Sequence, residues 1–183
     1  MTADAVEMQS LALAGVAAHG LERRHDDRGS ECFARHLPAN GTTGHEQTLV
    51  VRSHRGVLRG AYAHPSTAAN LSLVEGSAWV GMHDLRPASP TYGRSVTIEL
   101  GEGHALAAVR VPAGVAYALW FTAASVHALA TERVVGLVDE YTCRWDDPGL
   151  GFRWQPVDPV LSARDALAGS LNALRTSVAA ALG

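Results

Sequence analysis

Short hydrophobic runs, rich in β-branched and aromatic residues, dominate the middle of the chain. Clusters of Gly, Pro, Ser and Asp separate these runs, and such clusters favour turns. Short strands at regular spacing with turn signals between them are typical of an all-β sandwich or barrel. We therefore predict strands over Thr48–Arg52, Leu71–Val74, Ala78–Met82, Ser95–Leu100, Ala105–Val111, Val115–Thr122 and Arg133–Tyr141. The clearest turn signals are His54–Gly56, Pro87–Pro90 and Pro112–Gly114.

The C-terminal segment has a different period. Its apolar residues recur at helical spacing, at Leu167, Leu171, Leu174 and Val178. Ser162 precedes them, and Asp165 follows it by three residues, which is the spacing of a capping box. We predict a terminal helix packed on the outside of the barrel. The sequence has no internal repeat and no linker, so we expect one domain over residues 1–183.

Composition narrows the classes of function. Hydrophobic residues make up 47% of the 183 residues and charged residues 18%, which is typical of a packed domain rather than a disordered chain. All 15 basic residues are arginine and they are scattered, so we expect no nucleic-acid partner. Because the chain has no lysine, a Schiff-base lysine, a lysine general base and a lysine phosphate clamp are excluded.

The same survey bears on location and metals. Cys32 and Cys143 are too few for a disulfide framework. No apolar run is long enough to span a membrane, and the N-terminus lacks the basic segment of a signal peptide, so we expect a cytoplasmic protein. A metal site of the cupin type needs a His-x-His pair, then Glu and a later His. The chain offers no such pair among His64, His83, His104 and His127. We therefore expect no metal and no cofactor.

Several short sequence motifs, in order along the chain, resemble those of a known family. They are His25–Gly29, Gly56–Gly60, Asp84–Arg86 with Ser89–Gly93, Val111–Ala116, Trp145–Pro148 and Leu161–Asp165. In their order and spacing over residues 21–167, the chain resembles the dTDP-4-dehydrorhamnose 3,5-epimerases. The resemblance implies a cupin-type jelly-roll β-barrel, a homodimer, a small-molecule substrate bound inside the barrel and chemistry without a metal. Residues 1–20 would then form an arm or a strand exchanged in the dimer.

The resemblance assigns roles to retained residues. Arg59 matches an arginine that contacts the nucleotide phosphates, and Arg28 matches the family's first arginine motif. Asp165 matches the aspartate that orients a catalytic histidine, and Tyr141 matches a tyrosine that lines the sugar end of the site. Gln47 is retained near the nucleotide, two residues before Leu49, which replaces an asparagine.

Other positions depart from the family at its catalytic groups. Tyr62 stands where the family has its histidine general base, and Tyr117 replaces a second histidine. The lysine that steadies the enolate falls at Ala69 or Asn70, and the tyrosine acid falls at Val135. Removing a proton beside a ketone needs a base of near-neutral pKa and a donor for the oxyanion. A tyrosine with an ordinary pKa of about 10 is a poor base, so this chemistry needs another group here.

Two interpretations stay open for each candidate. His64 follows Tyr62 by two residues and points to the same face of a strand, so it is either a displaced base partnered by Asp165 or a rim histidine. Asp165 either serves the site or caps the terminal helix. Arg59 either holds an anionic ligand or pairs with an acidic neighbour. Tyr62, Tyr117 and Tyr141 either donate hydrogen bonds to a substrate carbonyl or fill the barrel.

Three hypotheses of function follow. Because Leu49, Tyr62, Tyr117 and Val135 make the inferred pocket apolar and aromatic, the leading one is a repurposed enzyme of specialised metabolism, such as antibiotic or polyketide biosynthesis. It would catalyse cyclisation, isomerisation or rearrangement of an apolar intermediate. The alternative is an epimerase of a dTDP-4-keto-6-deoxyhexose with a rearranged base such as His64. The third hypothesis is a non-catalytic binding protein.

Overall fold

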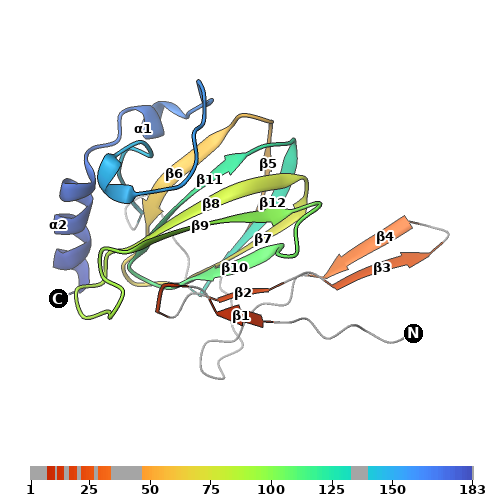
Figure 1. Cartoon of the computed structure of the whole chain (residues 1–183), viewed down its shortest axis with the longest axis horizontal. Helices are drawn as coiled ribbons and strands as arrows, with labels where there is room; N and C mark the ends of the chain where they lie inside the picture. Colours follow the sequence, from red (N-terminus) through yellow and green to blue (C-terminus); the bar gives the residue numbers. More distant parts are fainter. Residues whose placement is uncertain are drawn as a thin grey trace.

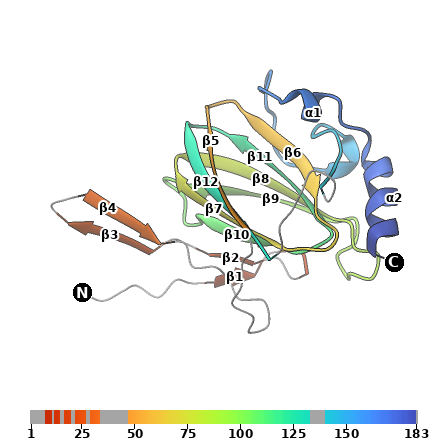
Figure 2. The same cartoon turned by 180° about the vertical axis from the view of Figure 1, so that it is seen from behind.

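Two antiparallel sheets form the body of the molecule (Figure 1). The computed structural model describes residues 8–10, 12–14, 17–19, 22–26, 29–33, 47–132 and 140–182. The first sheet has the strand order β1-β2-β10-β7-β12-β5, and the second has the order β13-β6-β11-β8-β9. A separate hairpin of β3 and β4 lies beside the sheets and belongs to neither (Figures 1 and 2).

The strands of the first sheet are β1 (Met8–Ser10), β2 (Ala17–His19), β10 (Ala108–Val111), β7 (Ala69–Glu75), β12 (Ser125–Thr131) and β5 (Gln47–Ser53). Those of the second are β13 (Tyr141–Thr142), β6 (Leu58–Ala63), β11 (Val115–Phe121), β8 (Ser77–Asp84) and β9 (Ser95–Gly101). The hairpin consists of β3 (Glu22–Asp26) and β4 (Gly29–Phe33). A 3-10 turn covers Pro148–Leu150, and two helices follow, α1 (Ala163–Ala166) and α2 (Leu171–Leu182).

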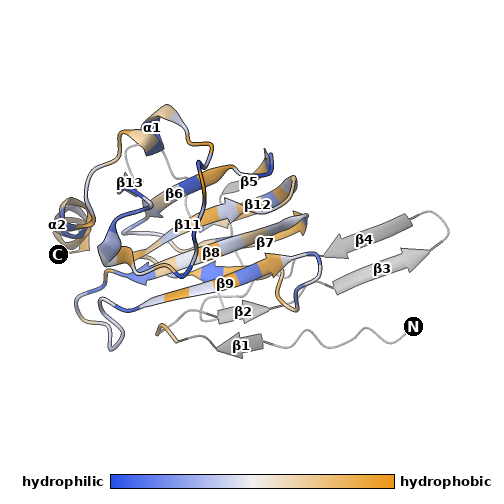
Figure 3. Cartoon of the chain, turned by 45° about the horizontal axis from the view of Figure 1, so that its top comes forward, coloured by the Kyte–Doolittle hydropathy of each residue, from blue (hydrophilic) through white to orange (hydrophobic). Residues whose placement is uncertain are grey.

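The predicted all-β fold with a C-terminal helix is confirmed. Alternation of hydrophobic and hydrophilic positions places one strand face in the interior, and Figure 3 shows this alternation along β9. β12 is a strand that the sequence analysis missed, because Ala128 and Ala130 have low strand propensity. Pairing with both β7 and β5 overrides that weakness. Of the predicted strand Arg133–Tyr141, residues 133–139 lie outside the described residues, and Tyr141 begins β13.

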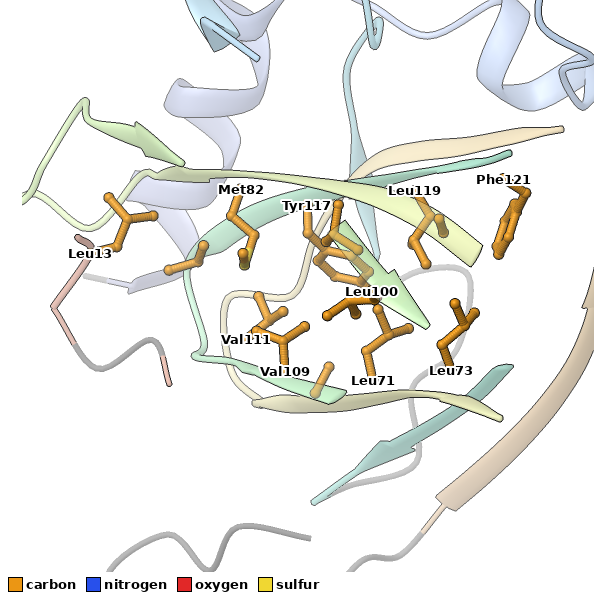
Figure 4. Packing of buried hydrophobic residues seen from close by; sticks show 14 residues of the cluster. Leu13, Leu71, Leu73, Met82, Leu100, Val109, Val111, Tyr117, Leu119 and Phe121 are labelled. Carbon is orange, nitrogen blue, oxygen red and sulfur yellow. The ribbon is translucent and has the colours of Figure 1, made fainter. Parts of the chain in front are cut away.

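The main hydrophobic core lies between the two sheets (Figure 4). Leu71 and Leu73 of the first sheet meet Tyr117, Leu119 and Phe121 of the second there. Transfer of such side chains from water contributes roughly 1.5–3 kcal/mol each, so this layer supplies much of the drive to fold.

A second core lies on the outer face of the second sheet. Ala61, Ala63, Ala116 and Ala118 of β6 and β11 pack there against Leu171, Leu174 and Val178 of α2. Three of the four apolar residues predicted to face the barrel are therefore buried. The fourth, Leu167, precedes α2 and is 86% exposed. Ser162 caps a helix, since its side chain accepts a hydrogen bond from the Asp165 backbone, but that helix is the short α1 and not the predicted terminal helix, which begins separately at Leu171. In the described part of the chain, neither helix has the length and hydrophobicity of a membrane span.

The Asp84–Thr91 turn is held by one buried carboxylate. Arg86 donates to both oxygens of Asp84 at 2.8 Å, and the hydroxyls of Ser89 and Thr91 donate to its Oδ2 atom at 2.6 Å. Arg86 also donates to the carbonyl of Ala14, whose N–H donates to Thr91. We call Asp84, Arg86, Ser89 and Thr91 the clasp. It ties the N-terminal residues to the second sheet, so this part of the family resemblance is structural.

Candidate functional site

A β-bulge in β6 turns two polar side chains to the interior. Tyr62 lies opposite Tyr117 and Arg59 lies opposite Leu119, so three steps along β6 match two steps along β11. Without the extra residue, Arg59 and Tyr62 would point to opposite faces of the sheet. Because Tyr117 and Leu119 belong to the core between the sheets, Arg59 and Tyr62 face that interior too.

Glycine at position 60 permits this bulge. Its φ is +109°, which residues with a side chain rarely adopt. An added Cβ would also lie 2.8 Å from the Tyr117 carbonyl oxygen and 3.0 Å from the Ala118 Cα. The bulge thus depends on close approach of the β6 and β11 backbones at this point.

Tyr62 is anchored at the first helix. Its hydroxyl donates to the Oδ2 atom of Asp165 at 3.0 Å, and Ser162 donates to the same atom at 2.9 Å. Asp165 is 3% exposed, and among the described residues its Oδ1 atom has no hydrogen-bond partner. Burial, and then the Asp165 carboxylate, raise the pKa of Tyr62, so the phenol keeps its proton. Asp165 therefore takes part in the helix cap with Ser162 and also accepts a hydrogen bond from Tyr62 in the interior. The cap and the candidate site thus share this residue.

Tyr117 is anchored by a histidine and a glutamate. The Nε2 atom of His64 lies 3.2 Å from the Tyr117 hydroxyl and 3.6 Å from the Oε2 atom of Glu140. His64 is only 4% exposed, so it is not a rim residue. Burial, and then Glu140, raise the pKa of Tyr117. Arg164 donates to the Glu140 side chain and to its carbonyl oxygen, which holds the glutamate in place.

The two arrangements meet at their aromatic rings. The Tyr62 and Tyr117 rings are 6.1 Å apart in an edge-to-face arrangement, a favourable geometry for aromatic pairs. The Arg164 guanidinium lies 5.7 Å from the Tyr62 ring centroid. We call the set Tyr62, His64, Tyr117, Glu140 and Asp165 the inner polar cluster. Figure 4 shows the Tyr117 side chain extending from the second sheet into the space between the sheets.

The structure brings together four of the six residues that the sequence proposed as catalytic: Tyr62, His64, Tyr117 and Asp165. Arg59 lies on the same face, where its Nε atom donates to the Ser53 hydroxyl at 3.0 Å. Tyr141 lies apart from them. It pairs with Ala63 in β13 and packs against the outer core that α2 covers.

The proposed substrate-binding residues are less fully described. Leu49 lies opposite Leu129 on the interior face of the first sheet and is 48% exposed. Gln47 begins β5 opposite Thr131, and Arg28 and Val135 lie outside the described residues. Of the two positions matched to the family's lysine, Ala69 and Asn70, Ala69 packs in the core between the sheets.

Sequence reasoning missed Glu140 and Arg164. Glu140 stands in the predicted strand Arg133–Tyr141 and Arg164 in the predicted helix cap, but only the fold brings Glu140 to His64 and Arg164 to Glu140. Asp165 was the partner proposed for His64, whereas the structure places Tyr117 and Glu140 beside His64. The Asp165 Oδ2 atom accepts hydrogen bonds from Tyr62 and Ser162 instead. Within the described ranges, no group of three or more His, Cys, Asp or Glu side chains could hold a metal ion.

Comparison with known proteins identifies the family to which the chain belongs. The model of the dTDP-4-dehydrorhamnose 3,5-epimerase family matches residues 10–173. A dTDP-4-dehydrorhamnose 3,5-epimerase of Sinorhizobium fredii is 27% identical over 186 residues, which cover 95% of this chain and 94% of that protein.

Solved structures show the same fold, a cupin-like jelly roll. NovW, a 4-keto-6-deoxy sugar epimerase from the novobiocin biosynthetic gene cluster of Streptomyces spheroides, has a TM-score of 0.82 at 24% identity, covering 99% of this chain and 94% of its own. The rmlC epimerase of Mycobacterium tuberculosis has a TM-score of 0.81 at 26% identity, covering 93% and 91%. The chain therefore belongs to the dTDP-4-dehydrorhamnose 3,5-epimerase family, whose members are enzymes that act on small molecules.

Proposed function

We propose that the protein epimerises a nucleotide-linked 4-keto-6-deoxyhexose at a carbon next to the ketone. The observation that carries this proposal is the arrangement of Tyr117, His64 and Glu140 on the interior face of the second sheet. It provides a proton acceptor where the family's histidines are replaced by tyrosines. The alternative hypothesis from the sequence, an epimerase with a rearranged base, is thus preferred over the leading one.

The proton would move through Tyr117. The C–H bond beside the ketone breaks, and its electron pair forms the enolate. The proton goes to the Tyr117 oxygen while the hydroxyl proton passes to Nε2 of His64, and Glu140 stabilises the resulting imidazolium. Base strength is then that of a histidine–carboxylate pair, not of an isolated phenol, which overcomes the high pKa of Tyr117.

The neighbouring residues would orient the substrate. Arg59 would hold the phosphates, since a guanidinium offers several donors in a fixed plane. The Tyr62 hydroxyl donates its hydrogen bond to Asp165, so its oxygen is left to accept one from a sugar hydroxyl. Tyr62 and Tyr117 lie on one sheet and approach the sugar from one side. The proton returned to the opposite side would therefore come from solvent.

The relatives support this substrate class. The Legionella pneumophila epimerase was solved in complex with dTDP-4-keto-L-rhamnose, and the Streptococcus suis RmlC in complex with dTDP-D-xylose. Both complexes hold a thymidine diphosphate sugar in a protein of this fold.

Proton exchange tests the proposal directly. The purified protein is incubated with dTDP-4-keto-6-deoxyglucose in deuterated water, and exchange at C3 and C5 is followed by NMR. We expect exchange at one of these carbons and its loss, by a factor of at least about 100, in His64→Ala, because general-base catalysis typically contributes that much. His54→Ala, on an exposed turn, is the control. Absence of exchange in folded wild-type protein would reject the epimerase.

A second candidate function is the cyclisation or rearrangement of an apolar intermediate in specialised metabolism, as the sequence first indicated. The observation that favours it is the apolar interior around Leu129 and Ala69. It predicts no exchange on the nucleotide sugar, and conversion of an apolar ketone that Tyr117→Phe slows. A non-catalytic binding protein would bind the nucleotide sugar without exchange. The homodimer, the single domain over residues 1–183 and the cytoplasmic location stay predictions.

A further inference from the structure

A second polar side chain, His127 of β12, faces the interior away from the inner polar cluster. Its strand neighbours are Val51 on β5 and Leu73 on β7, and Leu73 belongs to the core between the sheets. The imidazole stacks on Phe121 of the opposite sheet, with ring centroids 5.2 Å apart and an angle of 25° between the planes. His127 is 4% exposed, so it is a fixed part of the interior.

Arg59 brings a positive charge close to this imidazole. Its Nε atom is held by Ser53, which lies two residues along β5 from Val51, the direct neighbour of His127. Side chains in such diagonal positions are roughly 7–8 Å apart at the backbone, within reach of an arginine. Burial, and then the Arg59 charge, lower the pKa of His127 to about 4. The ring is therefore neutral beside a cation.

The charge that acts on His127 is that of the Arg59 cation. The Nδ1 atom of His127 is buried and has no hydrogen-bond partner among the described residues. An unsatisfied buried polar atom costs about 1–3 kcal/mol, so its place in the interior calls for an explanation. Around it, β5 and β7 contribute the apolar neighbours Val51 and Leu73, β11 contributes Phe121, and Arg59 supplies the charge. A phosphate oxygen would satisfy both the guanidinium and the imidazole.

The order of residues along β11 agrees with a sugar phosphate. Tyr117, Leu119 and Phe121 mark three successive interior positions, next to Tyr62, Arg59 and His127 respectively. Strand geometry makes the span from Tyr117 to Leu119 roughly 7 Å and that to Phe121 roughly 13 Å. A ligand whose ketone meets Tyr117 would thus place its phosphates at Arg59 and beyond.

We propose that His127 is a phosphate-binding residue, which together with Arg59 holds the diphosphate of the nucleotide-linked sugar and takes up a proton when the diphosphate binds. This inference rests on the proposed function, because it places the anionic end of that substrate. A phosphate beside the imidazole stabilises its protonated form, so binding at pH 6.5 consumes protons. By linkage, affinity then rises as the pH falls.

Titration calorimetry with dTDP, in two phosphate-free buffers of different ionisation enthalpy at pH 6.5, tests this. The wild-type protein should take up protons on binding. His127→Asn should bind dTDP at least about tenfold more weakly and take up no proton, since it loses a charge-assisted hydrogen bond to the phosphate. His127→Gln keeps an amide donor in a longer side chain, so it should recover part of the affinity without proton uptake. His104→Asn, at the surface ion pair with Glu99, is the matched control.

The outcomes separate the two proposals. Wild-type affinity and proton uptake in both folded His127 variants would overturn the role of His127 and leave the epimerase intact. Failure of the wild-type protein to bind dTDP would contradict both. Thymidine, which lacks phosphate, should bind the wild type and His127→Asn equally, and a difference between them would show that the substitution acts through the fold. Thermal unfolding of each variant checks that the protein is native.

Discussion

The clasp and the inner polar cluster are both built around buried carboxylates, but they hold them in opposite ways. In the clasp, both oxygens of Asp84 accept hydrogen bonds, and the residue is 0% exposed. In the inner polar cluster, Asp165 has one oxygen without a partner among the described residues. A saturated carboxylate serves the fold, whereas an unsaturated one beside Tyr62 is suited to interact with a ligand.

The two regions also differ in which force sets their protonation. Burial by itself would raise the pKa of Asp84, but hydrogen bonds from Arg86, Ser89 and Thr91 overcome it and hold that pKa well below its usual range. At Tyr62 and Tyr117 burial is the largest cause, and nearby carboxylates add to it, so both phenols hold their protons. The clasp therefore keeps the Asp84 carboxylate charged, whereas the inner polar cluster keeps the Tyr62 and Tyr117 phenols protonated.

The largest effect on stability is expected at the clasp. Asp84→Ala leaves the partly buried guanidinium of Arg86 and two hydroxyls without their acceptor, so the free energy of unfolding should fall by about 3 kcal/mol. Urea denaturation measures this. Asp146→Ala, which removes an exposed ion pair with Arg144, is the control and should leave the midpoint unchanged. A loss as small as that of the control would show that the clasp does not hold the turn.

The next effect is expected at the bulge that shapes the interior. Gly60→Ala should lower the free energy of unfolding by about 2 kcal/mol more than Gly103→Ala, because contact with the Tyr117 carbonyl is added to the strain. Gly103 also has a positive φ, +82°, but an added Cβ there meets nothing within 4 Å. The difference in urea midpoints therefore isolates the contact. Equal destabilisation would mean that β6 tolerates a side chain at its bulge.

A smaller effect, on pH dependence, is expected beside the clasp. His83 contacts Ser95 at 2.8 Å and Arg175 at 3.1 Å, and burial and then Arg175 lower its pKa to about 4. The unfolded chain, with an ordinary histidine pKa near 6.5, binds more protons, so stability should fall as the pH drops from 6.5 to 4. His83→Gln should flatten this part of the profile of melting temperature against pH, whereas His54→Gln should not. An unchanged slope would contradict a buried neutral His83.

The strand pattern was predictable because it depends on local sequence, as the runs around β8, β9 and β11 show. Ser162 could be named as a capping residue, but the end of its helix at Ala166 and the separate start of α2 were not predicted. The strand β12 was not predictable, because its alanines gain strand conformation only from pairing on both sides. Tyr62, His64, Tyr117 and Asp165 could be named from sequence. The roles of Glu140 and His127 could not, since each depends on a neighbour distant along the chain, His64 or Phe121.

The smallest effect on stability is expected at Tyr117, although its effect on chemistry should be large. Tyr117→Phe removes one hydrogen bond with His64 and keeps the ring in the core, so it should cost only about 1 kcal/mol of unfolding free energy. Tyr141→Phe, on the outer core, is the matched substitution.

Proton transfer by the inner polar cluster is tested most directly by deuterium exchange on dTDP-4-keto-6-deoxyglucose. The exchange rate per folded molecule is measured in Tyr117→Phe and in Tyr141→Phe. If the inner polar cluster moves the proton, Tyr117→Phe should lose exchange by at least about 100-fold. Tyr141→Phe should retain the wild-type rate. Exchange at the wild-type rate in Tyr117→Phe would contradict proton transfer from the substrate carbon to His64 through Tyr117.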